Sequence, residues 1–210
     1  MRKIKSVTFI IVFYIIYALV KALTYVFLLG QVKKWYPRKK GTLVFVESLP
    51  IENAGYQYRA KKWSELFNEN KLSSKVITII PDVNQFNKLL KKDVFRFYLY
   101  SLLKRFFQIL ALFNYETIVV RRELLQYNGY GNLFFEKLLH AFHPHVILDF
   151  DDNIHQHEAI NIKRSLFGRM LFENRNKFYD TLRLYKKFTV GSAYLKQLII
   201  KENKNDIKSE

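Results

Sequence analysis

The sequence lacks cysteine and contains little glycine or proline, which narrows the range of folds. With no cysteine among its 210 residues, the chain has neither a disulfide framework nor a thiolate metal site. Only 7 glycines and 4 prolines are present, against 19 phenylalanines and 14 tyrosines. A β-sandwich needs many turn residues, so this composition favours helices and buried strands. Because 50% of the residues are hydrophobic, we expect one sizeable core.

Acidic residues are absent from the first forty positions. Residues 1–40 hold nine of the 35 Lys and Arg residues and none of the 18 acids, in a chain of net charge +17. Residues 7–30 are almost wholly apolar, interrupted only by Lys21, and a run of ~20 apolar residues is long enough to cross a hydrocarbon core. We therefore predict that residues 1–40 form a membrane helix with basic flanks, and that an anionic membrane surface is a partner.

The basic residues beside the apolar segment also predict where the main domain lies. The larger basic group follows the segment, within residues 33–40. The positive-inside rule then places the domain on the cytoplasmic side of the inner (cytoplasmic) membrane. Two other interpretations of the segment remain open. One is a secretory signal peptide, and the other is a helix that lies in the membrane interface with Lys21 reaching toward water.

Residues 41–205 have the pattern of one α/β domain, in which short apolar runs alternate with helical periodicity. Strands are expected at 41–49, 75–80, 115–121, 146–150 and 187–190. Helices are expected at 56–70, 86–113, 133–141, 162–184 and 192–201. The helix at 86–113 is basic and aromatic, which fits a core helix with a solvated basic face or a surface that contacts anionic lipid. The predicted fold is a Rossmann-like parallel sheet with flanking helices, preceded by the N-terminal membrane helix.

The strand at 146–150 leads into a cluster of acidic residues, Asp149, Asp151 and Asp152. Parallel strands deliver such groups to the carboxyl edge of the sheet, where open α/β sheets bind their ligands. From the residues alone, three interpretations remain open. In the first, the acids only turn the chain and cap the next helix. Asp149 and Asp151 also match the Asp-x-Asp motif of haloacid dehalogenase-type phosphatases. Lastly, nearby histidines are candidate ligands of Zn²⁺ or Mn²⁺. They are His143, His145, His155 and His157.

Four motifs in fixed order resemble one enzyme family. They are Val-Val-Arg-Arg-Glu at 119–123, Gly-Asn-Leu-Phe-Phe-Glu-Lys-Leu-Leu at 131–139, Leu-Asp-Phe-Asp-Asp-Asn-Ile at 148–154 and Val-Gly-Ser-Ala-Tyr-Leu at 190–195. Together they resemble the N-terminal, acceptor-side domain of bacterial GT-B glycosyltransferases of family four, over about residues 42–200. Ser192 stands where that family usually has Asn, and both residues cap helices.

The resemblance implies a set of site residues. Asp149, Asp151 and Asp152 are the expected catalytic residues. Gly55 would let backbone N–H groups approach a diphosphate, and Arg59 would contact a phosphate or an acceptor anion. The expected substrate-binding residues are Gly55, Arg59, His155, Arg122 and Glu123. We expect no metal and no cofactor, since the nucleotide-sugar donor is a substrate.

The resemblance also implies partners. The expected ligands are a nucleotide-sugar and a glycan or glycolipid acceptor. It ends before the C-terminal donor-binding domain of such enzymes, so the chain is expected to be inactive alone, either as a truncated product or as a partner of a separate donor-binding domain. Nucleic acid is not expected, because no nucleic-acid-binding module is recognisable. The alternative hypothesis is a membrane-anchored binding or scaffold module without catalytic activity.

Overall fold

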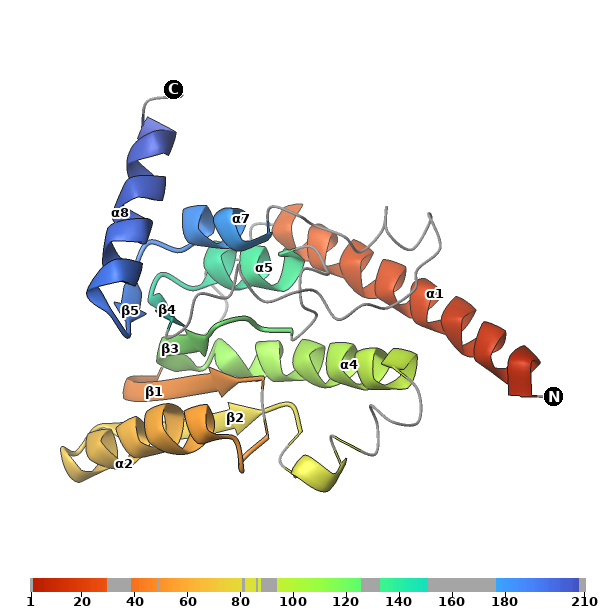
Figure 1. Cartoon of the computed structure of the whole chain (residues 1–210), viewed down its shortest axis with the longest axis horizontal. Coiled ribbons are helices and arrows are strands. Elements are labelled where there is room, and N and C mark those ends of the chain that lie inside the picture. Colours follow the sequence, from red (N-terminus) through yellow and green to blue (C-terminus); the bar gives the residue numbers. More distant parts are fainter. Residues whose placement is uncertain are drawn as a thin grey trace.

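The computed structural model describes residues 2–29, 39–48, 50–80, 82–85, 87, 94–125, 133–150 and 177–207. Its elements, in chain order, are α1 (Arg2–Leu29), β1 (Lys39–Glu47), the π-helix η1 (Tyr56–Lys61), α2 (Lys62–Glu69), β2 (Ser73–Thr78), α4 (Val94–Leu112), β3 (Tyr115–Arg121), α5 (Phe134–Phe142), β4 (Val146–Phe150), α7 (Lys177–Leu184), β5 (Phe188–Val190) and α8 (Ala193–Ile207) (Figure 1). Each predicted strand is confirmed within a few residues. Within the described part, each predicted helix is confirmed as well.

The strands form one five-stranded sheet in the order β2-β1-β3-β4-β5, and every pairing is parallel. The alternation of apolar strand and amphipathic helix predicts this arrangement, because parallel neighbours need a crossover between them. The parallel, Rossmann-like α/β fold is therefore confirmed. All strands end at the same edge of the sheet, which we call the carboxyl edge.

The two faces of the sheet are covered by different helices. One face presents Phe45 and Val119, which pack against Ala60 of η1 and Phe67 of α2. The other face presents alternate residues of the same strands, Val44 and Val46 of β1 among them, to a larger core. This core includes buried residues of α4, α5, α7 and α1. Successive side chains along a strand point to opposite faces, so an apolar strand buried on both sides serves both layers.

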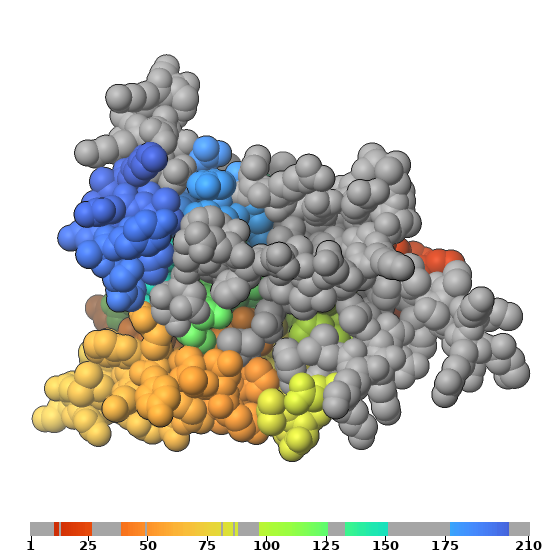
Figure 2. All heavy atoms as spheres, viewed as in Figure 1, coloured from red at the N-terminus to blue at the C-terminus, as the bar shows by residue number. Residues whose placement is uncertain are grey.

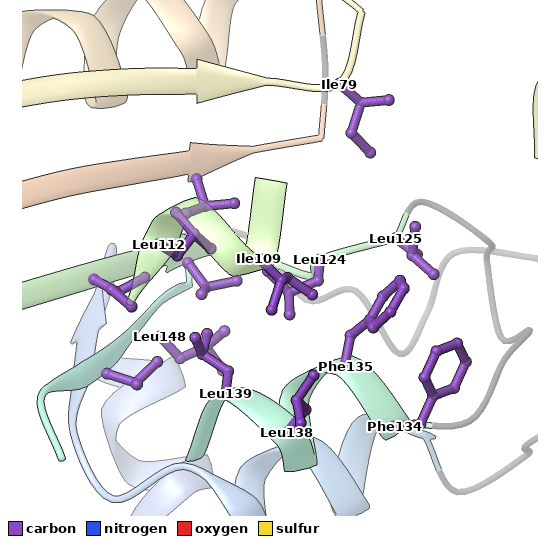
Figure 3. Close-up of a cluster of buried hydrophobic side chains, with 14 of the residues drawn as sticks. Ile79, Ile109, Leu112, Leu124, Leu125, Phe134, Phe135, Leu138, Leu139 and Leu148 are labelled. Atoms are coloured by element: carbon purple, nitrogen blue, oxygen red, sulfur yellow. The ribbon is translucent and has the colours of Figure 1, made fainter. Parts of the chain in front are cut away.

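The larger core is built mainly from α4, α5 and the strands beneath them. Figure 3 shows Phe135, Leu138 and Leu139 of α5 extending toward Ile109 of α4 and Leu148 of β4. The sequence Phe-Phe-Glu-Lys-Leu-Leu places its apolar residues on one face of a helix, as the helical period requires. Burial of these side chains fixes α5 beside the end of β3, where the candidate site lies.

The helix α1 packs on the outside of the α4 and α5 layer. Its inner face includes Tyr17, Val20 and Thr24, all buried, and the Tyr17 ring meets the Phe134 ring edge-on at a centroid distance of 5.5 Å. The helix predicted within residues 7–30 is confirmed, but its membrane-spanning role is not supported. Among the described residues, none of the helices has the combination of length and hydropathy that crossing a bilayer requires.

A half-buried histidine makes the stability of this fold pH-dependent. Burial, with smaller contributions from the nearby His143 and Lys186, lowers the pKa of His140 on α5 to about 4. His140 therefore stays neutral in the folded chain while the unfolded chain takes up a proton near pH 6.5. Because the unfolded state then binds more protons, stability falls as the pH drops from about 6.5 through about 4.

We expect this loss to amount to roughly 2 kcal/mol, allowing for the partial exposure of the ring. Urea unfolding followed by circular dichroism at several pH values between 7 and 4 measures it. Other groups titrate in the same interval, so the comparison is with His140→Gln, which should show a shallower decline than the unmodified chain. Parallel declines in the two proteins would contradict the assignment.

Candidate functional site at the carboxyl edge of the sheet

The strand order creates a switch point between β1 and β3. From β1 the chain crosses to β2 on one side, whereas from β3 it crosses to β4 on the other side. In open α/β sheets, ligands bind outside the carboxyl ends of the strands where such crossovers diverge. A ligand site is therefore expected at the residues that end β1, β3 and β4.

Polar side chains form a continuous row across this edge. Arg121 is in register with Asp149, and Asp149 is in register with Thr189. Glu47 extends the row on the other side of Arg121, through an ion pair with a distance of 2.7 Å between Nη1 and Oε2. In-register residues of parallel strands point to the same face. We call Glu47, Arg121, Asp149 and Thr189 the polar row.

A second arginine, Arg59 of η1, contacts this row. Arg59 donates from Nε to Oδ2 of Asp149 at 3.0 Å and from Nη2 to Oδ1 at 2.5 Å. The Thr189 hydroxyl donates to the same Oδ1 at 2.7 Å. The side chains of Arg59 and Asp149 are 25% and 11% exposed, and Thr189 is exposed, so solvent reaches this end of the polar row. Single turns of π-helix occur frequently at functional sites.

The ion pair between Glu47 and Arg121 is buried inside the protein. The side chains of Glu47 and Arg121 are almost completely buried, and Glu47 Oε1 also accepts the backbone N–H of Ser48 at 2.9 Å. Burial and the Glu47 carboxylate raise the pKa of Tyr56, which begins η1. Buried ions are stable only when they are paired and hydrogen-bonded, so this pair fixes the geometry around the switch point.

Gly55 has a different role from the predicted one. A Cβ atom at this position would lie 1.9 Å from Nη2 and 2.2 Å from Cζ of Arg121. The space beside Gly55 is thus filled by a guanidinium group, not open to a diphosphate. Its φ of −63° is helical, so the glycine is required for close packing and not for an unusual backbone conformation.

The loop that follows β3 is held by charged residues of α5 and α7. Lys177 of α7 donates to Glu123 at 2.5 Å, and the Leu124 N–H donates to Glu136 of α5 at 3.2 Å. Burial raises the pKa of Glu136, although Lys177 and backbone N–H groups lower it in part. Arg122 has φ = 61°, a left-handed conformation that is uncommon outside glycine and often marks functional positions.

Arg105 of α4 joins both sides of the switch point. It is fully buried, and its Nη2 donates to the Glu47 carbonyl oxygen at 2.8 Å while its Nε donates to the Leu124 carbonyl oxygen at 2.7 Å. The ends of β1 and of the β3 loop are therefore tied to one guanidinium. The prediction that the basic residues of this helix are solvated is wrong for Arg105, which is fully buried.

The structure brings some of the predicted site residues together. Gly55, Arg59, Arg122, Glu123 and Asp149 all lie at or beside the carboxyl edge. Asp151, Asp152 and His155 lie outside the described residues. In the described part of the chain, no group of three or more His, Asp or Glu side chains is arranged to hold a metal ion.

His143 has a structural role. Its Nδ1 accepts the backbone N–H of His145 at 3.2 Å, so Nε2 carries the proton and donates to the Tyr115 carbonyl oxygen at 2.7 Å. Both ring nitrogens are used within the fold, and the ring ties the start of β4 to the start of β3. A histidine satisfied in this way does not present a nitrogen to a metal.

Sequence reasoning missed Glu47, Arg105, Lys177 and Thr189 as parts of the site. One signal was available for the polar row. Glu47 and Arg121 each end an apolar strand, and charges that end neighbouring parallel strands meet at one edge. No comparable signal marks Arg105, since a basic residue on an amphipathic helix is solvated in most proteins.

Arg59 of the site lies on η1, and α8 begins just after the carboxyl end of β5. In Figure 2 the orange atoms of the η1 and α2 region and the blue atoms of α8 lie on two sides of a strip where green atoms of the chain around β3 reach the surface. Comparison of the chain with protein-family models, with curated proteins and with solved structures found no match.

Proposed function

We propose that this chain is the acceptor-side domain of a glycosyltransferase. It holds a glycan or glycolipid acceptor at the carboxyl edge of the sheet while a donor-binding domain presents the nucleotide-sugar. The observation that supports this most is the partly exposed Arg59–Asp149 pair at the switch point. Carboxylate oxygens accept hydrogen bonds from sugar hydroxyls, and a guanidinium donates to sugar oxygens. The sequence resemblance to GT-B acceptor-side domains supports the same class of enzyme.

The charges described at this edge favour a neutral ligand rich in hydroxyl groups. Three of the cations described at this edge, Arg59, Arg121 and Lys177, are each paired with a carboxylate at 2.7 Å or less, and a fourth, Arg105, donates to two backbone carbonyl oxygens. Phosphate sites instead present excess positive charge or backbone N–H groups at a helix N-terminus. The space beside Gly55 is occupied by Arg121, so this glycine does not form the close backbone approach that a diphosphate needs.

The contacts of Asp149 favour a positioning role. Its two oxygens accept three hydrogen bonds, two from Arg59 and one from Thr189. A carboxylate held in this way orients the guanidinium toward the acceptor. An aspartate nucleophile needs an oxygen that is able to attack, so the same contacts disfavour the phosphatase alternative.

Loss of the Arg59–Asp149 geometry should lower sugar transfer. The assay follows label from a panel of radiolabelled nucleotide-sugars into lipid-extractable or polymeric product. It uses full-length protein added to membranes and extract of source cells that lack the gene. Displacing a positioned acceptor by about 1 Å costs roughly 100-fold in rate, and we expect that loss for Arg59→Lys and for Asp149→Asn. Lysine keeps the charge of arginine but not its bidentate geometry.

Arg183 and Asp180 provide a matched control, because they form an exposed ion pair on α7 at 3.7 Å. Arg183→Lys and Asp180→Asn should leave the transfer rate unchanged. Full incorporation by Asp149→Asn would instead favour the scaffold hypothesis. Transfer by the purified protein without any extract would contradict the need for a separate donor-binding domain.

A further inference from the structure

The apolar side chains of α1 face outward, which is the reverse of the usual arrangement in a helix on the surface of a globular protein. Its described outward side chains are apolar apart from the Tyr25 hydroxyl: Ile11, Val12, Ile15, Ala18, Leu19, Ala22, Leu23, Tyr25 and Val26. We call them the outer face of α1. Ile15 and Leu19 are 54% and 58% exposed, and Val26 is 65% exposed. A helix on a protein surface normally turns its apolar stripe inward and its charged side toward water.

The one charged residue among the described side chains of α1 lies off this outer face. Lys21 is half-buried. It lies on the same side of the helix as the buried residues Tyr17 and Thr24, which is the side that contacts α4 and α5. The Thr24 hydroxyl donates to the Val20 carbonyl oxygen at 2.8 Å, so the inner face also satisfies its polar group within the helix. Apart from the Tyr25 hydroxyl, the described polar side chains of α1 thus lie toward the protein, and the outer face carries no charge.

From these faces we infer that the outer face of α1 lies in the interfacial region of an anionic lipid bilayer. An apolar helix face embeds at the boundary between headgroups and acyl chains, and basic residues beside it attract anionic lipid. Residues 1–40 supply that attraction, with nine Lys and Arg residues and no acid. This inference rests on α1 alone and does not depend on the proposed function.

The packing of α1 determines how it meets the bilayer. Tyr17, Val20 and Thr24 are buried within the domain, where α1 contacts α4 and α5. A helix that crosses a membrane is surrounded by lipid or by other spanning elements along its length. The middle of α1 instead has the sheet domain on one side, so only its outer face is available to lipid. We infer that α1 lies along the membrane surface and that the domain rests on that surface.

Flotation of the full-length protein with lipid vesicles tests this inference. Vesicles of phosphatidylcholine with about one-third phosphatidylglycerol should bind the protein more strongly than vesicles of phosphatidylcholine alone. Ile15→Ser with Leu19→Ser should weaken binding to the anionic vesicles at least about tenfold, since two apolar side chains no longer insert. The matched control is Leu66→Ser with Ile200→Ser, at sites that are each 45% exposed on α2 and α8. It should bind as the unmodified protein does.

Depth measurements test the orientation. The chain has no cysteine, so Ile15→Cys and Val26→Cys each accept one fluorophore. These positions are ~16 Å apart along the helix axis. Quenchers at known acyl depths should find both labels equally deep if α1 lies along the surface, and a label on Leu66→Cys should not be quenched. Labels at clearly different depths would overturn the orientation.

Two further results would overturn the lipid assignment. One is equal vesicle binding by the Ile15 and Leu19 double variant and the unmodified protein. The other is a dimer in sedimentation velocity without vesicles that dissociates in the same double variant, because the outer face would then cover a second copy of the chain.

Discussion

Replacing Arg121 by methionine should lower the free energy of unfolding by about 3–5 kcal/mol, because it removes the guanidinium that is paired with the buried Glu47 carboxylate. The change removes the 2.7 Å ion pair between two side chains that are almost fully buried. Urea unfolding followed by circular dichroism or tyrosine and tryptophan fluorescence measures the loss. This is the largest effect on stability that we expect from a single residue of the polar row.

A double-mutant cycle separates the ion pair from general disruption of the core. Glu47→Gln keeps the acceptor for the Ser48 N–H while removing the charge. Glu47→Gln combined with Arg121→Met should therefore be more stable than Arg121→Met alone by about 2 kcal/mol or more. Lys61→Met is the control, since Lys61 and Glu65 form an exposed pair at 4.0 Å that contributes at most about 0.5 kcal/mol. Strictly additive effects of the two buried changes would contradict the coupling.

Gly55→Ala should destabilise the chain by about 2–4 kcal/mol, although alanine normally stabilises a helical position. The backbone at Gly55 is helical and would accept alanine without strain. The cost arises because the new methyl group would lie 1.9 Å from the Arg121 Nη2 atom. Arg121 would have to move, and its movement would break the ion pair with Glu47.

The sign of the Gly55 effect should reverse when Arg121 is absent. In a chain that already carries Glu47→Gln and Arg121→Met, Gly55→Ala should be neutral or stabilising by up to about 1 kcal/mol. Gly41→Ala is the contrasting variant, because Gly41 has φ = +69° with no atom near its Cβ position. It should lose about 1 kcal/mol in either background, since only backbone strain is involved. An equal cost of Gly55→Ala in both backgrounds would show that the contact with Arg121 is not its cause.

The sequence predicts the layers of this fold better than the contacts of its site. The strands follow from short apolar runs, and the parallel sheet follows from their alternation with helices. Arg59 and Asp149 were both named as site residues, but they are 90 positions apart in the chain. Nothing in their local patterns indicates that they meet, because the pairing depends on strand order and on the place of η1 above the sheet.

Two features of α4 and η1 could not have been predicted from periodicity. Lys104 is exposed and Arg105 is fully buried, whereas Phe107 is 65% exposed. Hydrogen bonds to the Glu47 and Leu124 carbonyl oxygens offset the desolvation cost of burying Arg105. These partners are distant in the chain, so the residues around Arg105 do not reveal them. The π-helical turn of η1 spans only residues 56–61, which is too short for the apolar pattern to separate it from a regular helix.

The contact between Gly55 and Arg121 constrains the order in which these positions can change during evolution. A side chain at position 55 is tolerated only after the arginine at 121 has been lost, and that loss is tolerated only after the carboxylate at 47 has been neutralised. The three positions should therefore vary together among related sequences. A glycine at 55 should accompany an arginine at 121, and larger residues at 55 should appear only in lineages where both charges are gone.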